Sequence, residues 1–295
     1  MSLDVGFIGL GAIGQGMAAN LSRAGVLKQV YNRTESVARE FGSIYEVEVA
    51  DSISALSLCC DVIFICVSRD EDVQEVVSEI AQAAKPGAVV IDTSTVSSAT
   101  AQQLAKSLAE KNIHFLDAPV SGGVEGAKQG SLAMMVGGEE TILEKVRPIL
   151  EHIAKKIIYM GSAGAGQATK AVNQIMAAGI NHAVTEALAF ANAEELPIDK
   201  VIDVVGSGAA GNWFLTHRGA SMVDGRFTPG FKLALHHKDL QICQKMATEH
   251  DVQLPVIEIS LILYQRLMDQ GFGDEDISCL FRQKQSLFAK PENER

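Results

Sequence analysis

The sequence lacks any uninterrupted apolar run of about 20 residues, the length that a membrane-spanning helix needs. Its N-terminus also lacks a basic segment followed by an apolar core, which is the pattern of a secretory signal. Basic residues are scarce, 25 against 36 acidic ones, so the net charge is −11. An extended surface for nucleic acid or for an anionic membrane is therefore not expected. Together these absences predict a soluble, cytoplasmic protein that binds neither partner.

Paired cysteines are also missing. The cysteines form an odd set without a CxxC pair, and we expect reduced core residues at all of their positions: Cys59, Cys60, Cys66, Cys243 and Cys279. His236 and His237 are adjacent in an expected helix, so their side chains point about 100° apart, which is poor geometry for one shared metal ion. We predict no metal site.

The composition is that of a globular chain, with 47% hydrophobic and 21% charged residues, and 295 residues suggest two domains. Short apolar runs alternate with helical patterns in the first half, which predicts parallel strands joined by crossover helices. The strands are expected at Val5–Ile8, Lys28–Tyr31, Val62–Val67, Val89–Asp92, His114–Asp117, Met134–Val136 and Ile157–Met160. Helices are expected between them, for example Asp70–Ala84 and Ser97–Lys111, the latter with a serine cap.

The periodicity becomes helical after Met160 and stays so to the end. One helical pattern without proline runs from Gln167 to about Glu195 and is expected to bridge two domains. Further helices are expected at Asp199–Gly206, Asn212–Val223, Leu233–His250, Pro255–Gln270 and Asp276–Phe288. The prediction is an α/β Rossmann-like domain over residues 1–163, followed by an all-α domain over residues 164–295.

A glycine-rich segment lies directly between the first strand and the first helix. Gly9, Gly11 and Gly14 form GxGxxG there, with Ala12 and Ile13 inside the motif. The first glycine permits a tight turn, the second lets the backbone approach a pyrophosphate, and the third allows close packing of helix and strand. The helix N-terminus then faces the anion. This context predicts a dinucleotide site.

The end of the second strand bears on the choice of cofactor, because an acidic residue there would bind the adenosine ribose hydroxyls. The sequence instead has Asn32, Arg33 and Thr34. A guanidinium group binds a 2′-phosphate well, so NADP(H) is favoured, with NAD(H) as the weaker alternative. Arg33 as an ordinary solvated turn residue stays open as the other interpretation.

Two further strand ends carry candidate residues, because strand ends of this kind face the ligand crevice. Val67 and Ser68 are assigned to the cofactor. After the strand at 114–117, the Ser121 hydroxyl and the amides of Gly122 and Gly123 can converge as a concave site for a carboxylate. The composition of this second segment is also that of a simple loop.

The long helix carries a narrow polar stripe on an otherwise apolar surface. Its members fall on one side at 100° per residue: Lys170, Asn173, Gln174, Asn181 and Thr185. An isolated helical lysine is usually a surface charge, but a lysine in such a stripe at a domain boundary favours chemistry. Burial lowers the pKa of a lysine, so this group is suited to exchange a proton with an alcohol near neutral pH.

Further along, Phe231, Lys238 and Asp239 lie on a loop that runs into a helix. We assign Phe231 to the substrate and Lys238 to the cofactor or substrate. Taken alone, an adjacent lysine and aspartate more often form a pair on a helix surface.

On these motifs the chain resembles the β-hydroxyacid dehydrogenase family, which includes 3-hydroxyisobutyrate dehydrogenase, tartronate semialdehyde reductase and the glyoxylate or succinic semialdehyde reductases. The resemblance covers nearly the whole sequence. It is carried by four segments: GFIGLGAIGQGMAANL over 6–21, DAPVSGG over 117–123, GAGQATKAVNQ over 164–174 and KDL over 238–240.

The resemblance implies an active site between the two domains, with Lys170 as the catalytic acid or base. It also implies that Ser121, Gly122 and Gly123 hold the substrate carboxylate, that Thr95 lies near the nicotinamide, and that Lys238 lines the cofactor end. The tip at 32–34 resembles that of NADP-using members. The chain departs from the family in having Gln174 where a second asparagine often follows Asn173, and this leaves the substrate open.

The expected reaction is hydride transfer between NADPH and the aldehyde or ketone carbon of a small carboxylate, with Lys170 protonating the oxygen. A homodimer or homotetramer is expected, formed by the helical domain. The alternatives are a non-catalytic dinucleotide-binding sensor or scaffold, and an imine reductase on the same architecture. A 6-phosphogluconate dehydrogenase has similar motifs but a much longer chain.

Overall fold

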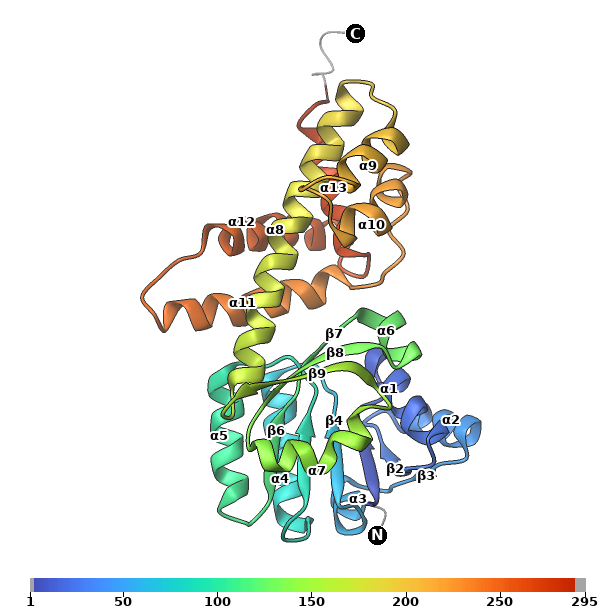
Figure 1. Cartoon of the computed structure of the whole chain (residues 1–295), viewed down its shortest axis with the longest axis vertical. Helices are drawn as coiled ribbons and strands as arrows, with labels where there is room; N and C mark the ends of the chain where they lie inside the picture. Colours follow the sequence, from blue (N-terminus) through green and yellow to red (C-terminus); the bar gives the residue numbers. More distant parts are fainter. Residues whose placement is uncertain (1–2, 290–295) are drawn as a thin grey trace. The chain divides into compact units, whose positions relative to one another are not determined.

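The computed structural model describes residues 3–289 and divides into two compact units, Met1–Lys170 and Ala171–Arg295. Within its described part, the first unit contains one sheet of nine strands with helices on both faces (Figure 1). The strands are β1 (Val5–Ile8), β2 (Leu27–Tyr31), β3 (Glu48–Val49), β4 (Val62–Ile65), β5 (Val89–Asp92), β6 (His114–Asp117), β7 (Val120–Ser121), β8 (Leu132–Gly137) and β9 (Ala154–Gly161).

The strand order defines the type of fold. It runs β3-β2-β1-β4-β5-β6-β8-β7, and β9 also pairs with β8. The first six strands of this order are parallel, whereas β8 runs antiparallel to β6. The parallel part has the strand order of a dinucleotide-binding fold, in which the order of successive strands across the sheet reverses between β1 and β4. Ligands bind outside the carboxyl ends of the strands at such a switch point.

Alternating side chains of the central strands bury against helices on opposite faces of the sheet. Phe7 and Phe64, whose rings stack with centroids 5.7 Å apart, belong to one core, and Ile63 and Ile65 belong to the other. The first core includes side chains of α1 (Ala12–Arg23), α2 (Glu35–Tyr45) and α7 (Glu140–Leu150), and the second those of α3 (Ile53–Cys59), α4 (Asp70–Ala83) and α5 (Ser98–Ala109). Because both faces are covered, the strands consist of continuous apolar runs.

The short helix α6 (Gly123–Gln129) is held tightly against α1. A Cβ atom on Gly16 would lie 2.8 Å from the backbone carbon of Ala127, so only glycine allows this approach. The Asn20 side chain donates to the Ala127 carbonyl at 2.7 Å. Helix α1, which follows the glycine-rich loop after β1, therefore also supports the segment that follows Ser121.

The second unit is helical. Helix α8 (Ala165–Ala193) begins in the first unit and continues through the second, where its apolar side chains join those of the later helices in one core. These helices are α9 (Ile198–Gly206), α10 (Trp213–Val223), α11 (Leu233–Thr248), α12 (Pro255–Asp269), the 3₁₀ helix η1 (Ile277–Leu280) and α13 (Phe281–Ser286). No helix within residues 3–289 is long and apolar enough to cross a membrane.

Most elements begin or end a few residues from their expected boundaries, and two of these differences follow from side-chain hydrogen bonds. The strand expected to reach Val67 ends at Ile65, because the Val67 amide donates to the Ser94 hydroxyl at 3.0 Å instead of continuing the ladder. The helix expected over 276–288 is split into η1 and α13. There the Asp276 carboxylate accepts bonds from both the amide and the hydroxyl of Ser278, which tightens the first turn.

Candidate functional site

The loop between β1 and α1 has the geometry that its glycines predict. Gly9 has a φ of 99°, and a Cβ atom there would overlap the Cys66 carbonyl. A Cβ atom on Gly14 would overlap the Gly9 carbonyl, so helix and strand approach closely only without side chains. A Cβ atom on Gly11, in contrast, would meet nothing within 4 Å.

This loop fits the pyrophosphate of a dinucleotide. The N-cap residue Gly11 makes no side-chain capping bond, and the first turn of α1, which begins with Ala12 and Ile13, contains no acidic residue. The amides at this helix start are therefore available to an anion, and the backbone at Gly11 leaves room for its approach.

The tip of β2 combines one structural residue with one exposed cation. The Asn32 side chain accepts from the Leu10 amide at 2.9 Å and donates to the Thr34 carbonyl at 3.0 Å, so it ties the glycine loop to the tip. Arg33 has an 85% exposed side chain and pairs with Asp72 at 3.1 Å. An exposed pair of this kind contributes little stability, so the guanidinium group is free to turn to another anion.

The loops after β4 and β5 meet at the carboxyl edge of the sheet. Ser94 is buried and accepts the Val67 amide through its hydroxyl, which joins the two loops directly. Ser68 is exposed, and Thr95 is half-buried between two buried neighbours. Val67, Ser68 and Thr95, all assigned to the cofactor, thus belong to adjoining strand ends.

Lys170 and the segment Ser121–Gly123 come together within the first unit. The buried Lys170 ammonium donates to the Val120 carbonyl at 2.9 Å, directly before Ser121. Gly122 and Gly123 have φ values of 134° and 64°, which side chains rarely allow. The structure therefore brings a cation beside a glycine turn whose amides follow a serine hydroxyl, an arrangement suited to a carboxylate and a neighbouring oxygen.

A carboxylate to which the sequence assigned no role binds the start of the helix that carries this lysine. Asp117, at the end of β6, accepts the Gly164 amide at 2.8 Å and the Gln167 amide at 2.9 Å. These amides lie at the start of α8, where a negative charge is favourable. The only available signal was a carboxylate at a strand end, because nothing in the sequence pairs residue 117 with a helix about 50 positions later.

In the second unit, four polar residues form a chain of hydrogen bonds. Asn173 donates to Gln174 at 2.8 Å, Gln174 donates to Asp239 at 2.6 Å, and Asp239 pairs with Lys238 at 2.8 Å. The Asp239 side chain is only 6% exposed, so this is not a pair on a helix surface. Asp239 is the member of the chain to which sequence reasoning gave no role.

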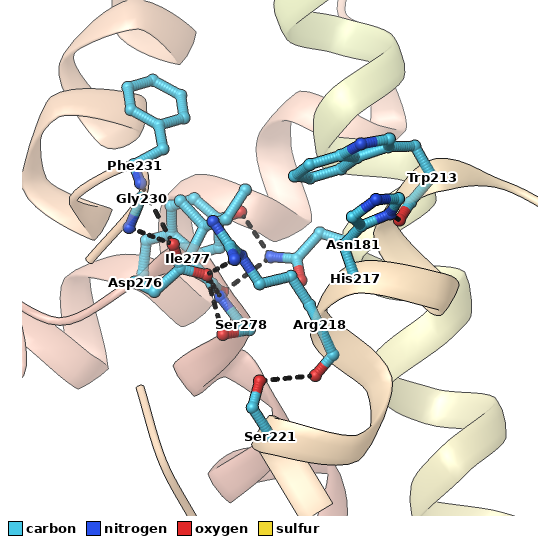
Figure 2. A network of polar contacts seen from close by, with 11 residues as sticks. Asn181, Trp213, His217, Arg218, Ser221, Gly230, Phe231, Asp276, Ile277 and Ser278 are labelled. Carbon is cyan, nitrogen blue, oxygen red and sulfur yellow. Dashed lines mark hydrogen bonds and ion pairs between the residues drawn. The ribbon is translucent and has the colours of Figure 1, made fainter. Parts of the chain in front are cut away.

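The remaining predicted residue, Phe231, lies on a loop fixed by another buried carboxylate (Figure 2). Asp276 accepts the amides of Gly230 and Phe231 at 2.9 and 3.0 Å, and the Arg218 guanidinium lies 3.6 Å away. Figure 2 shows the Phe231 ring pointing away from this carboxylate. The ring centroid lies 5.1 Å from that of His236.

Two buried carboxylates, Asp92 and Asp117, are the last residues of β5 and β6. Burial raises the pKa of Asp92 and of Asp117 to about 6. One Asp92 oxygen accepts the Ser94 amide at 3.0 Å, and the other has no hydrogen-bond partner among residues 3–289. In the same part of the chain, no cluster of three or more His, Cys, Asp or Glu residues is suited to hold a metal ion.

Comparison with known proteins shows the same two-part organisation. Residues 4–161 match the family described as the NAD binding domain of 6-phosphogluconate dehydrogenase. Residues 164–283 match the family described as NAD-binding of NADP-dependent 3-hydroxyisobutyrate dehydrogenase. An uncharacterized oxidoreductase of Bacillus subtilis is 38% identical over 288 residues, covering 96% of this chain and 99% of that protein.

Several similar proteins have named activities. The 2-hydroxy-3-oxopropionate reductase of Escherichia coli K12 is 36% identical over 282 residues, covering 94% of this chain and 96% of that protein. The structure of 3-hydroxyisobutyrate dehydrogenase from Mycobacterium tuberculosis with L-serine has a TM-score of 0.87 and 31% identity, covering 96% of this chain and 99% of that one.

The fold and the glycine loop define an oxidoreductase that binds a nicotinamide dinucleotide. More narrowly, the chain belongs to the 3-hydroxyisobutyrate dehydrogenase-like family of β-hydroxyacid dehydrogenases. The predicted Rossmann-like domain followed by a helical domain is confirmed.

The buried Asp92 predicts a specific pH dependence of stability. The pKa of Asp92 in the folded state is about 6, above the ordinary 3.8, so the folded protein binds the carboxyl proton more tightly than the unfolded chain does. The protonated carboxyl therefore stabilises the fold at low pH, and this stabilisation is lost as the pH rises through about 6. Between pH 4 and 7 the free energy of unfolding of Asp92→Asn should therefore gain roughly 2 kcal/mol relative to wild type. Urea unfolding across that pH range measures the difference.

Asp61→Asn is the matched control. The Asp4 amide donates to Asp61 and lowers its pKa, so the carboxylate contributes stability that is kept as the pH rises. The free energy of unfolding of Asp61→Asn should therefore not rise relative to that of wild type as the pH increases above 4. A flat difference for Asp92→Asn would contradict the raised pKa of Asp92.

Proposed function

We propose that this protein is an NADP(H)-dependent oxidoreductase that interconverts a small β-hydroxyacid, or a related hydroxy acid, and its semialdehyde or keto form. The observation that carries the proposal is the bond between the buried Lys170 ammonium and the Val120 carbonyl, at the first residue before the Ser121–Gly123 turn. A cation is thereby held beside a group of donors suited to a carboxylate, which is what reduction of a carbonyl group in a small acid needs.

In this proposal each group in the first unit has one task. Gly9, Gly11, Ala12, Ile13 and Gly14 bind the pyrophosphate, and the bound nicotinamide supplies or accepts the hydride. The Ser121 hydroxyl and the amides of Gly122 and Gly123 hold the substrate carboxylate. Lys170 donates a proton to the oxygen as the alcohol forms and removes it in the reverse direction.

The residues of the second unit are proposed to complete substrate and cofactor binding. Asn173, Gln174 and Phe231 are assigned to the substrate and Lys238 to the cofactor. The hydrogen-bond chain from Asn173 to Lys238 supports a common role, because Asp239 fixes both Gln174 and Lys238. We further propose functional domains over 1–163 and 164–295, so that all of α8 belongs with the helical domain.

Lys170→Met tests the proton-transfer role. We expect NADPH-dependent reduction of glyoxylate, succinic semialdehyde, tartronate semialdehyde or methylmalonate semialdehyde by wild type, and a turnover about 10²- to 10⁴-fold lower in the variant. NADPH fluorescence titration should show retained cofactor binding. Lys128→Met, which removes an exposed lysine from α6, is the matched control and should keep full turnover.

The same panel separates catalysis from mere cofactor binding. Wild-type inactivity with every substrate, together with tight NADPH binding, would favour a dinucleotide-binding sensor or scaffold. Near-normal turnover of Lys170→Met would reject lysine as the acid or base.

We propose NADP(H) over NAD(H) because the β2 tip presents the exposed Arg33 and no carboxylate between residues 32 and 34. A charge-assisted hydrogen bond contributes about 1.5–3 kcal/mol, so Arg33→Ser should weaken NADPH binding roughly 10- to 100-fold and leave NADH binding nearly unchanged. Arg39→Ser, which removes another exposed arginine paired with Glu35, is the control. Equal losses for both cofactors, measured by fluorescence titration, would contradict the 2′-phosphate role.

We also propose that a second copy of the chain covers an apolar face of the second unit. A groove of about 650 Å³ lies along α8 and α12, lined by Gly179, His182, Ala183, Glu186, Ala187, Phe190, Val256, Ile259 and Phe288. Phe190 is 53% exposed, and burial lowers the pKa of His182 to about 4, so the ring is neutral. Contiguous apolar surface is uncommon on monomers, and most soluble oligomers pair identical faces around a twofold axis.

Sedimentation equilibrium at micromolar concentration tests this face. Wild type should sediment as a dimer or tetramer, and Phe190→Glu combined with Ile259→Glu should lower the mass, because each change buries an unpaired charge. Leu58→Glu, at an exposed leucine of the first unit, should leave the mass unchanged. A monomeric wild type would refute the proposal.

A further inference from the structure

The side chain of Gln167 makes two hydrogen bonds that no part of the proposed chemistry uses. This residue lies in the first turn of α8 and is 1% exposed. Its Oε1 accepts the Val96 amide at 3.2 Å, and its Nε2 donates to the Ser94 carbonyl at 2.8 Å. The two bonds flank Thr95, so one amide group holds the backbone on both sides of that residue.

Further hydrogen bonds connect both partners of this contact, Ser94 and Gln167, to other strand ends. The Ser94 hydroxyl accepts the Val67 amide at 3.0 Å, which carries the connection to the loop after β4. The Gln167 amide itself donates to Asp117 at 2.9 Å, which fixes the turn of helix from which the side chain projects. Gln167 therefore links three strand ends, β4, β5 and β6, to the start of α8.

Lys170 lies three residues after Gln167, about one helical turn further along the same helix. Its ammonium is bound to the Val120 carbonyl. The same turn of α8 thus carries Lys170 and, through the Gln167 side chain, binds the loop that contains Thr95. An amide side chain suits this contact, because glutamate lacks the donor for the Ser94 carbonyl, and methionine has no donor and only a weak sulfur acceptor.

We propose that Gln167 is a positioning residue for the reaction. Its amide keeps a fixed separation between the loop at 94–96, assigned to the cofactor, and the lysine assigned to proton transfer. This inference rests on the proposed function. Reduction of one carbonyl group needs a hydride at carbon and a proton from Lys170 at oxygen, so both donors must keep their spacing, and a displacement of about 1 Å can slow such a step 100-fold.

Hydrogen exchange in the protein without substrate tests the contact itself. In Gln167→Met the Val96 amide loses its acceptor, and we expect it to exchange at least about 10-fold faster than in wild type. Gln29→Met is the matched control, because Gln29 is also buried in the first unit but its Oε1 has no partner among residues 3–289. Exchange of Val96 should be unchanged in this control.

Kinetics test the positioning role. We expect kcat of Gln167→Met to fall about 10- to 100-fold with KM for the acid changed less than about 3-fold, and the isotope effect with 4-deuterated NADPH to rise as hydride transfer becomes rate-limiting. A merely structural loss would lower the folded fraction and kcat, but leave the isotope effect as in wild type. Gln167→Glu, which keeps the acceptor and loses the donor, should shift the same quantities in the same direction and serves if the methionine variant does not fold.

The outcomes are distinct. Unchanged Val96 exchange in Gln167→Met would overturn the contact, and a wild-type kcat and isotope effect would overturn its positioning role. Wild-type inactivity on the whole substrate panel would refute the proposed function, whereas the exchange measurement would still decide whether Gln167 holds the loop.

Discussion

The arrangement of the first unit depends on the Asp117 carboxylate at the start of α8. This side chain ends a parallel strand, and its two oxygens accept the Gly164 and Gln167 amides. The glycines around it are required for the contact, since a Cβ atom on Gly166 would lie 2.6 Å from the Asp117 carbonyl. A helix that begins this close to a strand end brings its first turn to the edge of the sheet where ligands bind.

The same edge concentrates groups that are unfavourable for folding. Asp92 and Asp117 are buried and lie opposite each other on the neighbouring strands β5 and β6. Loss of water around each carboxylate raises its pKa. Gly122 and Gly123 adopt backbone conformations that side chains rarely allow. Such features are typical of functional sites, where the surrounding structure must impose them. Here the two apolar cores on either face of the sheet supply that support.

Much of the fold follows from local sequence, because apolar runs and glycine positions report on their own segments. β1, β5 and β6 have the predicted bounds, and Ser97 caps α5 by accepting the Thr100 amide. The polar stripe of α8 also indicated buried Gln174, Asn181 and Thr185. The roles of Asp117, Gln167 and Asp239 were not predictable, because each acts on backbone or side chains about 50 to 70 positions away. The two-residue strands β3 and β7 are too short for a periodic signal.

The Asn32 side chain makes two hydrogen bonds, one to the Leu10 amide and one to the Thr34 carbonyl. These two bonds constrain which side chains the chain can carry at the tip of β2. An acidic residue at this position would still accept the Leu10 amide, but it has no donor for the Thr34 carbonyl and would set two oxygens against each other. The turn would have to be rebuilt together with the new side chain. The side chain at position 32 and the shape of the loop are therefore physically coupled, and a carboxylate introduced there requires a compensating change in the turn.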